Sequence, residues 1–190
     1  MPQLKPRFLS FEDYLAYDDG TDKLYELFNG ELIEVPPESG FNVEAANFLF
    51  AIFLAQVGHR RVRGHGLELE VHGEPKNRYP DLTILRPEHS ELLQRRNTIR
   101  LTMPPPLLVV EVVSPGSVQR DRDYIAKRSQ YEAIGIPEYW LVNPQDQTLL
   151  ILELVQGQYV QNTLFAGDQT VRSPQFGVMA FTVRQCLELA

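Results

Sequence analysis

Apolar spacing near the start of the chain predicts a short helix followed by a hairpin. Ser10-Phe-Glu-Asp13 has the form of a capping box, which opens a helix to about residue 17. Apolar and polar residues partly alternate over 23–28, and a second strand-like segment follows at 31–35. Asn29-Gly30 stands between the two segments and predicts the tight turn of a hairpin.

The next segment is a long apolar helix. Asn42 is its expected cap, and Gly58 is its expected stop after Val57. The longest apolar stretch in it, residues 48–54, is too short to span a bilayer.

Short strands and one long loop are expected in the centre of the chain. The predicted strands are residues 61–63, 67–72, 81–85 and 107–113. The last of these is a nearly continuous aliphatic run, which is the pattern of a central strand covered on both faces. The polar, proline-tipped segment 86–106 is interpreted as a long loop with one helical turn, and loops of that size are often functional.

The remaining pattern completes an α/β protein with a mixed β-sheet core flanked by helices. Its predicted elements are a helix at 121–134, a strand at 138–142, a hairpin of 149–154 and 158–165, and a helix at 182–189. We expect one domain over residues 1–190, with an N-terminal helix and hairpin at about 8–36, a core at about 41–144 and a C-terminal hairpin and helix at about 148–189.

Composition and charge restrict the possible functions. Cys186 is the only cysteine, which excludes a cysteine-based zinc site and favours a cytoplasmic setting. The net charge of −7 is unlike that of a protein that coats DNA. It does not exclude a nuclease, because bound divalent cations present positive charge to phosphate. Basic residues also gather in local clusters, each of which alone is more typical of a solvated surface: His59, Arg60, Arg61 and Arg63; Arg95, Arg96 and Arg100; Arg120, Arg122, Lys127 and Arg128.

Glu111 is the first candidate for chemistry. It lies within the aliphatic run 107–113, where an uncompensated carboxylate costs several kcal/mol. Such a charge is retained cheaply only where the strand meets a cleft, a salt-bridge partner or a metal ion. Asp81 poses the same problem at the start of the strand 81–85.

If the two strands are neighbours, Asp81 and Glu111 converge at one end of the sheet. Two carboxylates that close repel each other unless a cation lies between them, and hard oxygen ligands suit Mg²⁺ or Mn²⁺. The alternative from spacing alone is that Glu111 pairs with an arginine and Asp81 caps a turn, because Pro-Asp is a common turn dipeptide.

The helix after this strand adds further candidates. Asp123, Lys127 and Tyr131 follow one another at i, i+4 and i+8 and share a face. Lys127 can therefore face the carboxylates and orient a nucleophile. The alternative is an ordinary surface pair of Asp123 with Lys127, and for Tyr131 packing of the helix on the sheet is the favoured role.

An ordered set of motifs resembles the Uma-type (Uma-two) restriction endonuclease family of the PD-(D/E)XK nuclease superfamily, formerly a domain of unknown function. The motifs are Tyr25-Glu-Leu27, Asn29-Gly-Glu31, Pro80-Asp81, the run 108–115, Asp123, Lys127, Tyr131 and the run 135–144. The resemblance implies a restriction-endonuclease-like fold and Mg²⁺-dependent hydrolysis of phosphodiester bonds, with nucleic acid, expected to be DNA, as the partner.

The same resemblance assigns roles to individual residues. It makes Asp81 and Glu111 the metal ligands, with the backbone carbonyl of Val112 as a further ligand. The standard motif has a lysine where this chain has Val113, and Lys127 resembles its migrated replacement. An additional acid is expected from Glu26, Glu31 or Glu44, among which the sequence does not choose, and the role of Asp123 is left open.

The leading prediction is a metal-dependent DNA endonuclease. The alternative is a catalytically inactive nuclease-fold module that binds nucleic acid or a protein partner, as the acidic charge and Val113 suggest. A homodimer is expected by analogy with nucleases of this superfamily. The apolar run 149–154 is accordingly either a core strand or a dimer surface.

Overall fold

A six-stranded mixed sheet forms the centre of the computed structural model, which describes residues 7–187 apart from the side chains of residues 161 and 162. Its strand order is β11-β10-β9-β8-β6-β3. These strands are β3 (Val62–Gly64), β6 (Leu82–Ile84), β8 (Leu108–Val112), β9 (Glu138–Asn143), β10 (Thr148–Val155) and β11 (Gln158–Ala166). Among the described strands of this sheet, β8 and β9 pair in parallel and all other neighbours pair antiparallel. The predicted mixed α/β architecture is confirmed.

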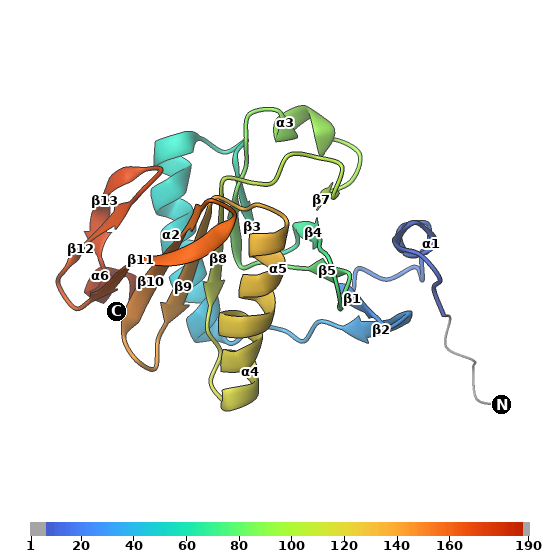
Figure 1. Cartoon of the computed structure of the whole chain (residues 1–190), viewed down its shortest axis with the longest axis horizontal. Coiled ribbons are helices and arrows are strands. Elements are labelled where there is room, and N and C mark those ends of the chain that lie inside the picture. Colours follow the sequence, from blue (N-terminus) through green and yellow to red (C-terminus); the bar gives the residue numbers. More distant parts are fainter. Residues whose placement is uncertain (1–6, 188–190) are drawn as a thin grey trace.

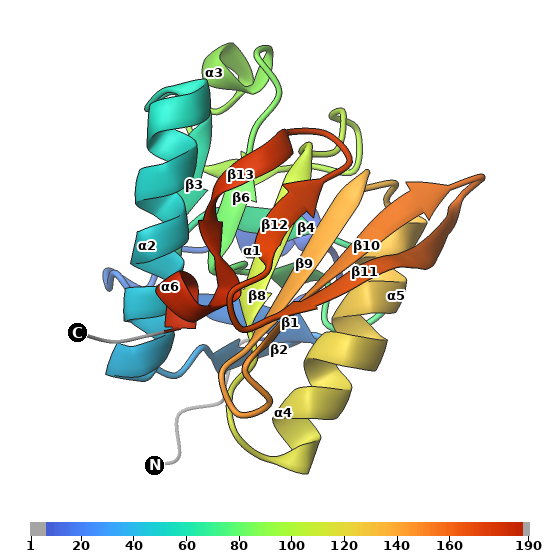
Figure 2. The same cartoon turned by 90° about the vertical axis from the view of Figure 1, so that its left-hand side faces the viewer.

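Helices cover both faces of this sheet (Figures 1 and 2). On one face lies α2 (Gly40–Val57), with the short α6 (Val183–Leu187) beside it. On the other face runs one continuous helix made of α4 (Ser117–Asp121), the π-helical segment η1 (Arg122–Lys127) and α5 (Arg128–Ala133). This helix connects β8 to the parallel β9, as a crossover between parallel strands requires.

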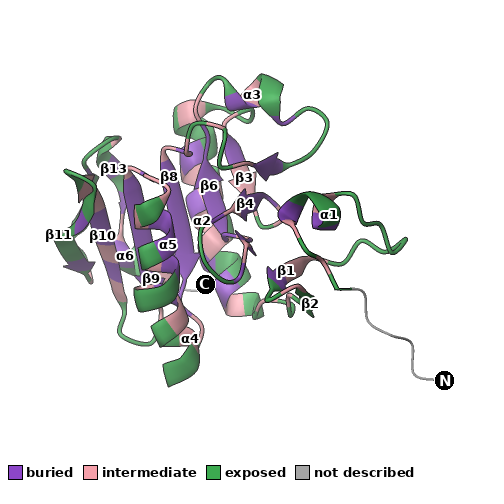
Figure 3. Ribbon diagram, turned by 45° about the vertical axis from the view of Figure 1, so that its right-hand side comes forward, coloured by how far each residue is buried: buried purple, intermediate pink, exposed green. Residues whose placement is uncertain are grey.

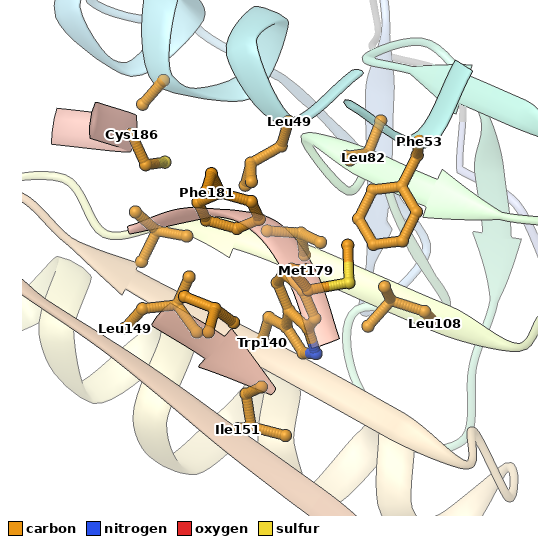
Figure 4. Close-up of a cluster of buried hydrophobic side chains, with 14 of the residues drawn as sticks. Leu49, Phe53, Leu82, Leu108, Trp140, Leu149, Ile151, Met179, Phe181 and Cys186 are labelled. Carbon is orange, nitrogen blue, oxygen red and sulfur yellow. The ribbon is translucent and has the colours of Figure 1, made fainter. Parts of the chain in front are cut away.

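Alternation along β8 divides the interior into two cores. Leu108, Val110 and Val112 belong to the core under α2, whereas Val109 belongs to the core under α5. Figure 4 shows the α2 side, where Leu49 and Phe53 of the helix approach Trp140 of β9. The side chain of Trp140 is fully buried in this core.

The N-terminal segment forms as its sequence predicts. Ser10 caps α1 (Phe11–Leu15) and completes a capping box with Asp13. The hairpin of β1 (Tyr25–Phe28) and β2 (Glu31–Glu34) turns through Asn29 and Gly30. Both turn residues have positive φ, of 48° and 78°, which Asn and Gly tolerate best.

Two predicted helix starts are wrong. Ser39, rather than Asn42, caps α2, and its hydroxyl accepts the Asn42 N–H at 3.2 Å. The amide of Asn42 is thereby left free to contact another element. The crossover helix begins at Ser117, before the predicted residue 121, because Gly116 ends the preceding turn at φ 109°.

Four short strands were not predicted, namely β5 (Asn77–Arg78), β7 (Thr98–Ile99), β12 (Thr170–Ser173) and β13 (Gly177–Thr182), whereas β4 (Glu68–Glu70) lies within the predicted strand 67–72. β5 pairs with β4, and β12 pairs with β13. β7 pairs in parallel with β4 and lies inside the segment interpreted as a loop. The predicted helical turn in that segment is α3 (His89–Leu92).

Two apolar segments differ in their surroundings. Within the described residues, α2 alone is long and apolar enough by length and composition to cross a membrane, which is weak evidence because core helices pass the same test. Here it packs on the sheet through Ala45, Leu49 and Phe53. β10 lies between β9 and β11, with Leu149 and Ile151 in the core, so most of the run 149–154 is core strand (Figure 3).

Candidate active site

Asp81 and Glu111 come together at one end of the central sheet. β6 and β8 pair antiparallel with Leu82 opposite Val110, so extending this register by one residue places Asp81 opposite Glu111. The Val112 N–H donates to Asp81 Oδ2 at 2.6 Å and fixes that carboxylate. The predicted convergence of the two acids is what the strand pairing produces.

Both carboxyl groups are buried, with exposed fractions of 8% for Asp81 and 2% for Glu111. Burial raises the pKa of Asp81 well above its usual value, and the nearby charge of Glu111 adds to this rise. Burial likewise raises the pKa of Glu111, although Lys127 opposes the change. Positive charge beside the two carboxyl groups would therefore strongly stabilise their ionised forms.

Lys127 supplies one positive charge to this site. Its Nζ donates to Glu111 Oε2 at 2.7 Å and lies 3.0 Å from Asp123 Oδ1. Burial alone would lower the pKa of Lys127, but the attraction of Glu111 and Asp123 outweighs it and leaves that pKa raised. The residue remains a cation, and its pair with Asp123 is buried rather than the surface pair that spacing also allowed.

Asp123 is almost completely buried at 1% exposure. Its Oδ1 also contacts Arg122 Nε, at 3.4 Å, whereas its Oδ2 has no hydrogen-bond partner among the described residues. Asp123 and Lys127 both lie in η1, where the helix has i→i+5 hydrogen bonds and a wider turn. Such π-helical turns frequently occur at functional sites.

Tyr131 both packs and bonds. Its ring is fully buried and meets Tyr139 edge-on, with ring centroids 5.1 Å apart. The packing role favoured from sequence is present, and in addition the hydroxyl donates to Glu111 Oε1 at 2.6 Å. Both oxygens of Glu111 therefore accept a hydrogen bond, one from Lys127 and one from Tyr131.

A pocket of about 70 Å³ opens beside Asp81, between α2 and the sheet. Its lining includes Glu38, Asn42 and His65. The Asn42 amide donates to Ser114 Oγ at 2.9 Å, to Glu38 Oε2 at 3.2 Å and to the Val112 carbonyl at 3.3 Å. The carbonyl predicted as a metal ligand therefore lies at this site and accepts a long hydrogen bond from Asn42.

None of the three candidate additional acids lines the pocket beside Asp81, although the charge of Glu26 contributes, with those of Asp123 and Glu111, to the raised pKa of Arg122. Glu26 forms an ion pair with Arg78 at 3.1 Å, and Glu31 and Glu44 are exposed outside the pocket lining. The acid beside Asp81 is instead Glu38, whose charge contributes to the raised pKa of Asp81. Sequence reasoning missed Glu38 because it lies in the turn before α2, although its position near a helix start was a usable signal.

The family model of Uma2, described as "Putative restriction endonuclease", matches residues 11–184. The chain belongs to the Uma2 family. No curated protein matches it.

Among solved structures, this Uma2 chain is similar to a crystal structure described as a "putative nuclease belonging to DUF820" from Anabaena variabilis. The TM-score is 0.67 at 15% sequence identity, and the match covers 95% of this chain and 98% of the other. Identity that low shows the fold alone. The nuclease-type fold inferred from the sequence is confirmed.

The donor set of this Uma2 site fits a divalent cation with an incomplete protein shell. Within residues 7–187 no group of three or more His, Cys, Asp or Glu side chains is arranged to hold an ion. Mg²⁺, however, is usually bound by one or two carboxylates, with water and substrate phosphate completing its octahedron. Asp81 and Glu111 are such a pair, and Asp81 Oδ1 accepts no hydrogen bond from the described residues.

Proposed function

We propose that this protein is a Mg²⁺- or Mn²⁺-dependent endonuclease that hydrolyses phosphodiester bonds of DNA. The observation that carries the proposal is the buried pair of Asp81 and Glu111 at the end of two adjacent strands. Lys127 donates a hydrogen bond to Glu111 of this pair. A catalytic assignment accounts for three ionisable groups in an interior where each alone is costly.

Asp81 and Glu111 are the proposed ligands of the cation. The bound ion supplies Lewis acidity toward phosphate and lowers the pKa of a coordinated water. Asp81 is held by the Val112 N–H through one oxygen, which leaves the other to bind. Glu111 is held by Lys127 and Tyr131, so its carboxylate is oriented before any ligand arrives.

Lys127 is proposed to orient the attacking water and offset negative charge on the phosphate. Its raised pKa keeps it protonated at neutral pH, so it acts as a cation and hydrogen-bond donor and not as a general base. Asp123 holds the ammonium group in place from the same helix.

The test is a cleavage assay on plasmid and single-stranded DNA with Mg²⁺ or Mn²⁺. We expect cleavage by the wild type and a cleavage rate lowered at least about 100-fold in Asp81→Asn and in Glu111→Gln. Glu44→Gln should cleave at the wild-type rate, because that carboxylate is exposed on α2. Wild-type inactivity on both substrates, or variants as active as the wild type, would refute the proposal.

A non-catalytic module that binds nucleic acid or a protein partner is the second candidate. It is favoured by the full set of hydrogen bonds on Glu111 and by Val113 at the usual lysine position. Absence of divalent-metal binding at Asp81 and Glu111 would support it. A homodimer and a cytoplasmic setting remain predictions from the sequence.

A further inference from the structure

A basic groove lies at the late end of α2, outside the lining of the pocket beside Asp81, and β3 connects the two because Arg63 lines the groove and Gly64 the pocket. The groove has a volume of about 740 Å³ and is formed by the turn from α2 into β3 on one side and by α3 and its flanking residues on the other. The charged residues in its lining are His59 (an ionisable imidazole), Arg60, Arg61, Arg63 and Glu91. In Figure 2 the late end of α2 and α3 lie together at the top, and α4 lies at the bottom.

The three arginines of this groove have no carboxylate partner among the described residues. Of the eleven other arginines, all within the described residues, six pair with acids, namely Arg78, Arg96, Arg100, Arg120, Arg122 and Arg184. In a chain with a net charge of −7, three neighbouring unpaired guanidinium groups form a local excess of positive charge. They repel one another until an anion binds.

Backbone carbonyls hold two of these side chains in place. Arg63 Nη1 donates to the Val62 carbonyl at 2.9 Å and to the Arg60 carbonyl at 3.2 Å, and Arg61 Nε donates to the Leu85 carbonyl at 3.0 Å. These bonds orient the guanidinium groups without neutralising them. Arg60 is exposed and makes no hydrogen bond through its side chain to the described residues.

The C-terminal dipole of α2 does not account for the cluster. A helix end carries roughly half a negative charge, whose effect is confined to its last turn. Three full positive charges exceed this, and Glu91 supplies one further negative charge across the groove.

We propose that this groove binds backbone phosphates of a nucleic acid at a second contact outside the candidate active site. Guanidinium groups favour phosphate because their planar donors match its oxygens. The α2 residues that line the pocket beside Asp81 run from Asn42 to Phe50, and the groove is lined by the last residue of the helix, Val57, so the two contacts are roughly 10–23 Å apart along α2. Along α2 only Glu44 is charged, so little repulsion opposes a nucleic acid that runs between them.

The choice of nucleic acid as the ligand rests on the proposed function, and the test separates the two claims. Fluorescence anisotropy with a labelled duplex of about 20 base pairs is measured across a salt series in an Asp81→Asn background, which prevents cleavage. The variants are Arg60→Ala, which breaks no hydrogen bond of that side chain in the structure, and the triple substitution Arg60→Ala, Arg61→Ala and Arg63→Ala. Arg172→Ala on β12, exposed and outside the groove lining, is the charge-matched control.

We expect Arg60→Ala to reduce the steepness of the plot of log affinity against log salt by about 1, and the triple variant to reduce it by about 2–3. Near 0.05 M salt the triple variant should bind at least about tenfold more weakly than its parent. Arg172→Ala should bind within about twofold of its parent. Thermal melting checks that the triple variant is folded, and Arg60→Ala keeps the test valid if it is not.

Equal affinity and slope for Arg60→Ala, the folded triple variant and their parent would overturn the groove proposal, and so would absence of duplex binding by all of them. Groove-dependent binding by a wild type that cleaves nothing would uphold the groove and refute the nuclease. Cleavage by the wild type, together with normal duplex binding by the arginine variants, would uphold the nuclease and refute the groove.

Discussion

Lys127 Nζ lies 2.7 Å from Glu111 Oε2 and 3.0 Å from Asp123 Oδ1, with all three side chains buried. The lysine comes from the crossover helix and Glu111 from the strand that precedes it in the sequence. Lys127 thus serves two acids, of which Asp123 also contacts Arg122 Nε at 3.4 Å, and a third acid, Asp81, stands opposite Glu111 without a cation of its own in hydrogen-bond contact. This imbalance is the physical basis of the proposed metal site.

Replacing Lys127 should strongly destabilise the fold. Lys127→Met keeps the aliphatic volume but leaves Glu111 buried without its cation and Asp123 with only its 3.4 Å contact to Arg122, which we expect to cost about 3–5 kcal/mol in the free energy of unfolding. Urea unfolding measures the loss. Lys23→Met is the matched control, because the pair of Lys23 with Glu34 is about half exposed on each side and should contribute below about 1 kcal/mol. Equal losses for the two variants would contradict the buried network.

Tyr131→Phe should separate packing from carboxylate positioning. The ring remains, and the hydrogen bond to Glu111 is lost, at an expected cost of about 1–3 kcal/mol. Tyr159→Phe is a suitable control because that buried hydroxyl donates to the Ile136 carbonyl, away from the acids. Both variants should lose similar stability by urea unfolding, and only Tyr131→Phe should also lose about tenfold or more in cleavage rate. Equal cleavage rates would limit Tyr131 to packing.

Glu138 should make stability fall with rising pH. Burial raises its pKa above the usual value despite hydrogen bonds from Trp140 and Ser173. A carboxyl whose pKa is raised on folding binds more protons in the native than in the unfolded state, so its contribution is favourable at low pH and declines from the unfolded pKa of 4.5 up to the folded pKa.

Glu138→Gln removes this titration. The unfolding free energy of the wild type relative to the variant should therefore be greatest near about pH 4 and decrease toward neutral pH. A difference that is constant across this range would show that burial does not perturb Glu138.

Glu38 should support metal binding from outside the Asp81–Glu111 pair. It lines the pocket beside Asp81, and its carboxylate accepts from Asn42. We expect Glu38→Gln to weaken Mn²⁺ binding by about tenfold, as loss of an outer partner typically does. Glu44→Gln, on the exposed side of the same helix region, should leave the affinity unchanged. A Glu38 variant with wild-type affinity would remove Glu38 from the site.

The central features of the fold were predictable because they are encoded locally. The aliphatic run around Glu111 specified a central strand, Asn29-Gly30 specified a hairpin turn, and Ser10 with Asp13 specified a capping box. The candidate acids were predictable for the same reason, since a charge within an apolar strand is conspicuous in sequence.

The remaining features depend on contacts between distant segments. β7 is a strand because it pairs with β4, and its two residues are too few to show a pattern that predicts this pairing. Tyr131 was recognisable as a packing residue, but its hydrogen bond to Glu111 depends on how the crossover helix lies on the sheet. Glu38 was missed because only the fold brings the turn before α2 beside Asp81.

Isothermal titration with Mn²⁺ of the wild type, Asp81→Asn and Glu111→Gln tests the central claim most directly. The account predicts saturable binding by the wild type and affinity lowered at least about tenfold in each variant, with Glu44→Gln unchanged. Wild-type binding that both substitutions leave intact, or no binding at all, would contradict a metal site at this carboxylate pair.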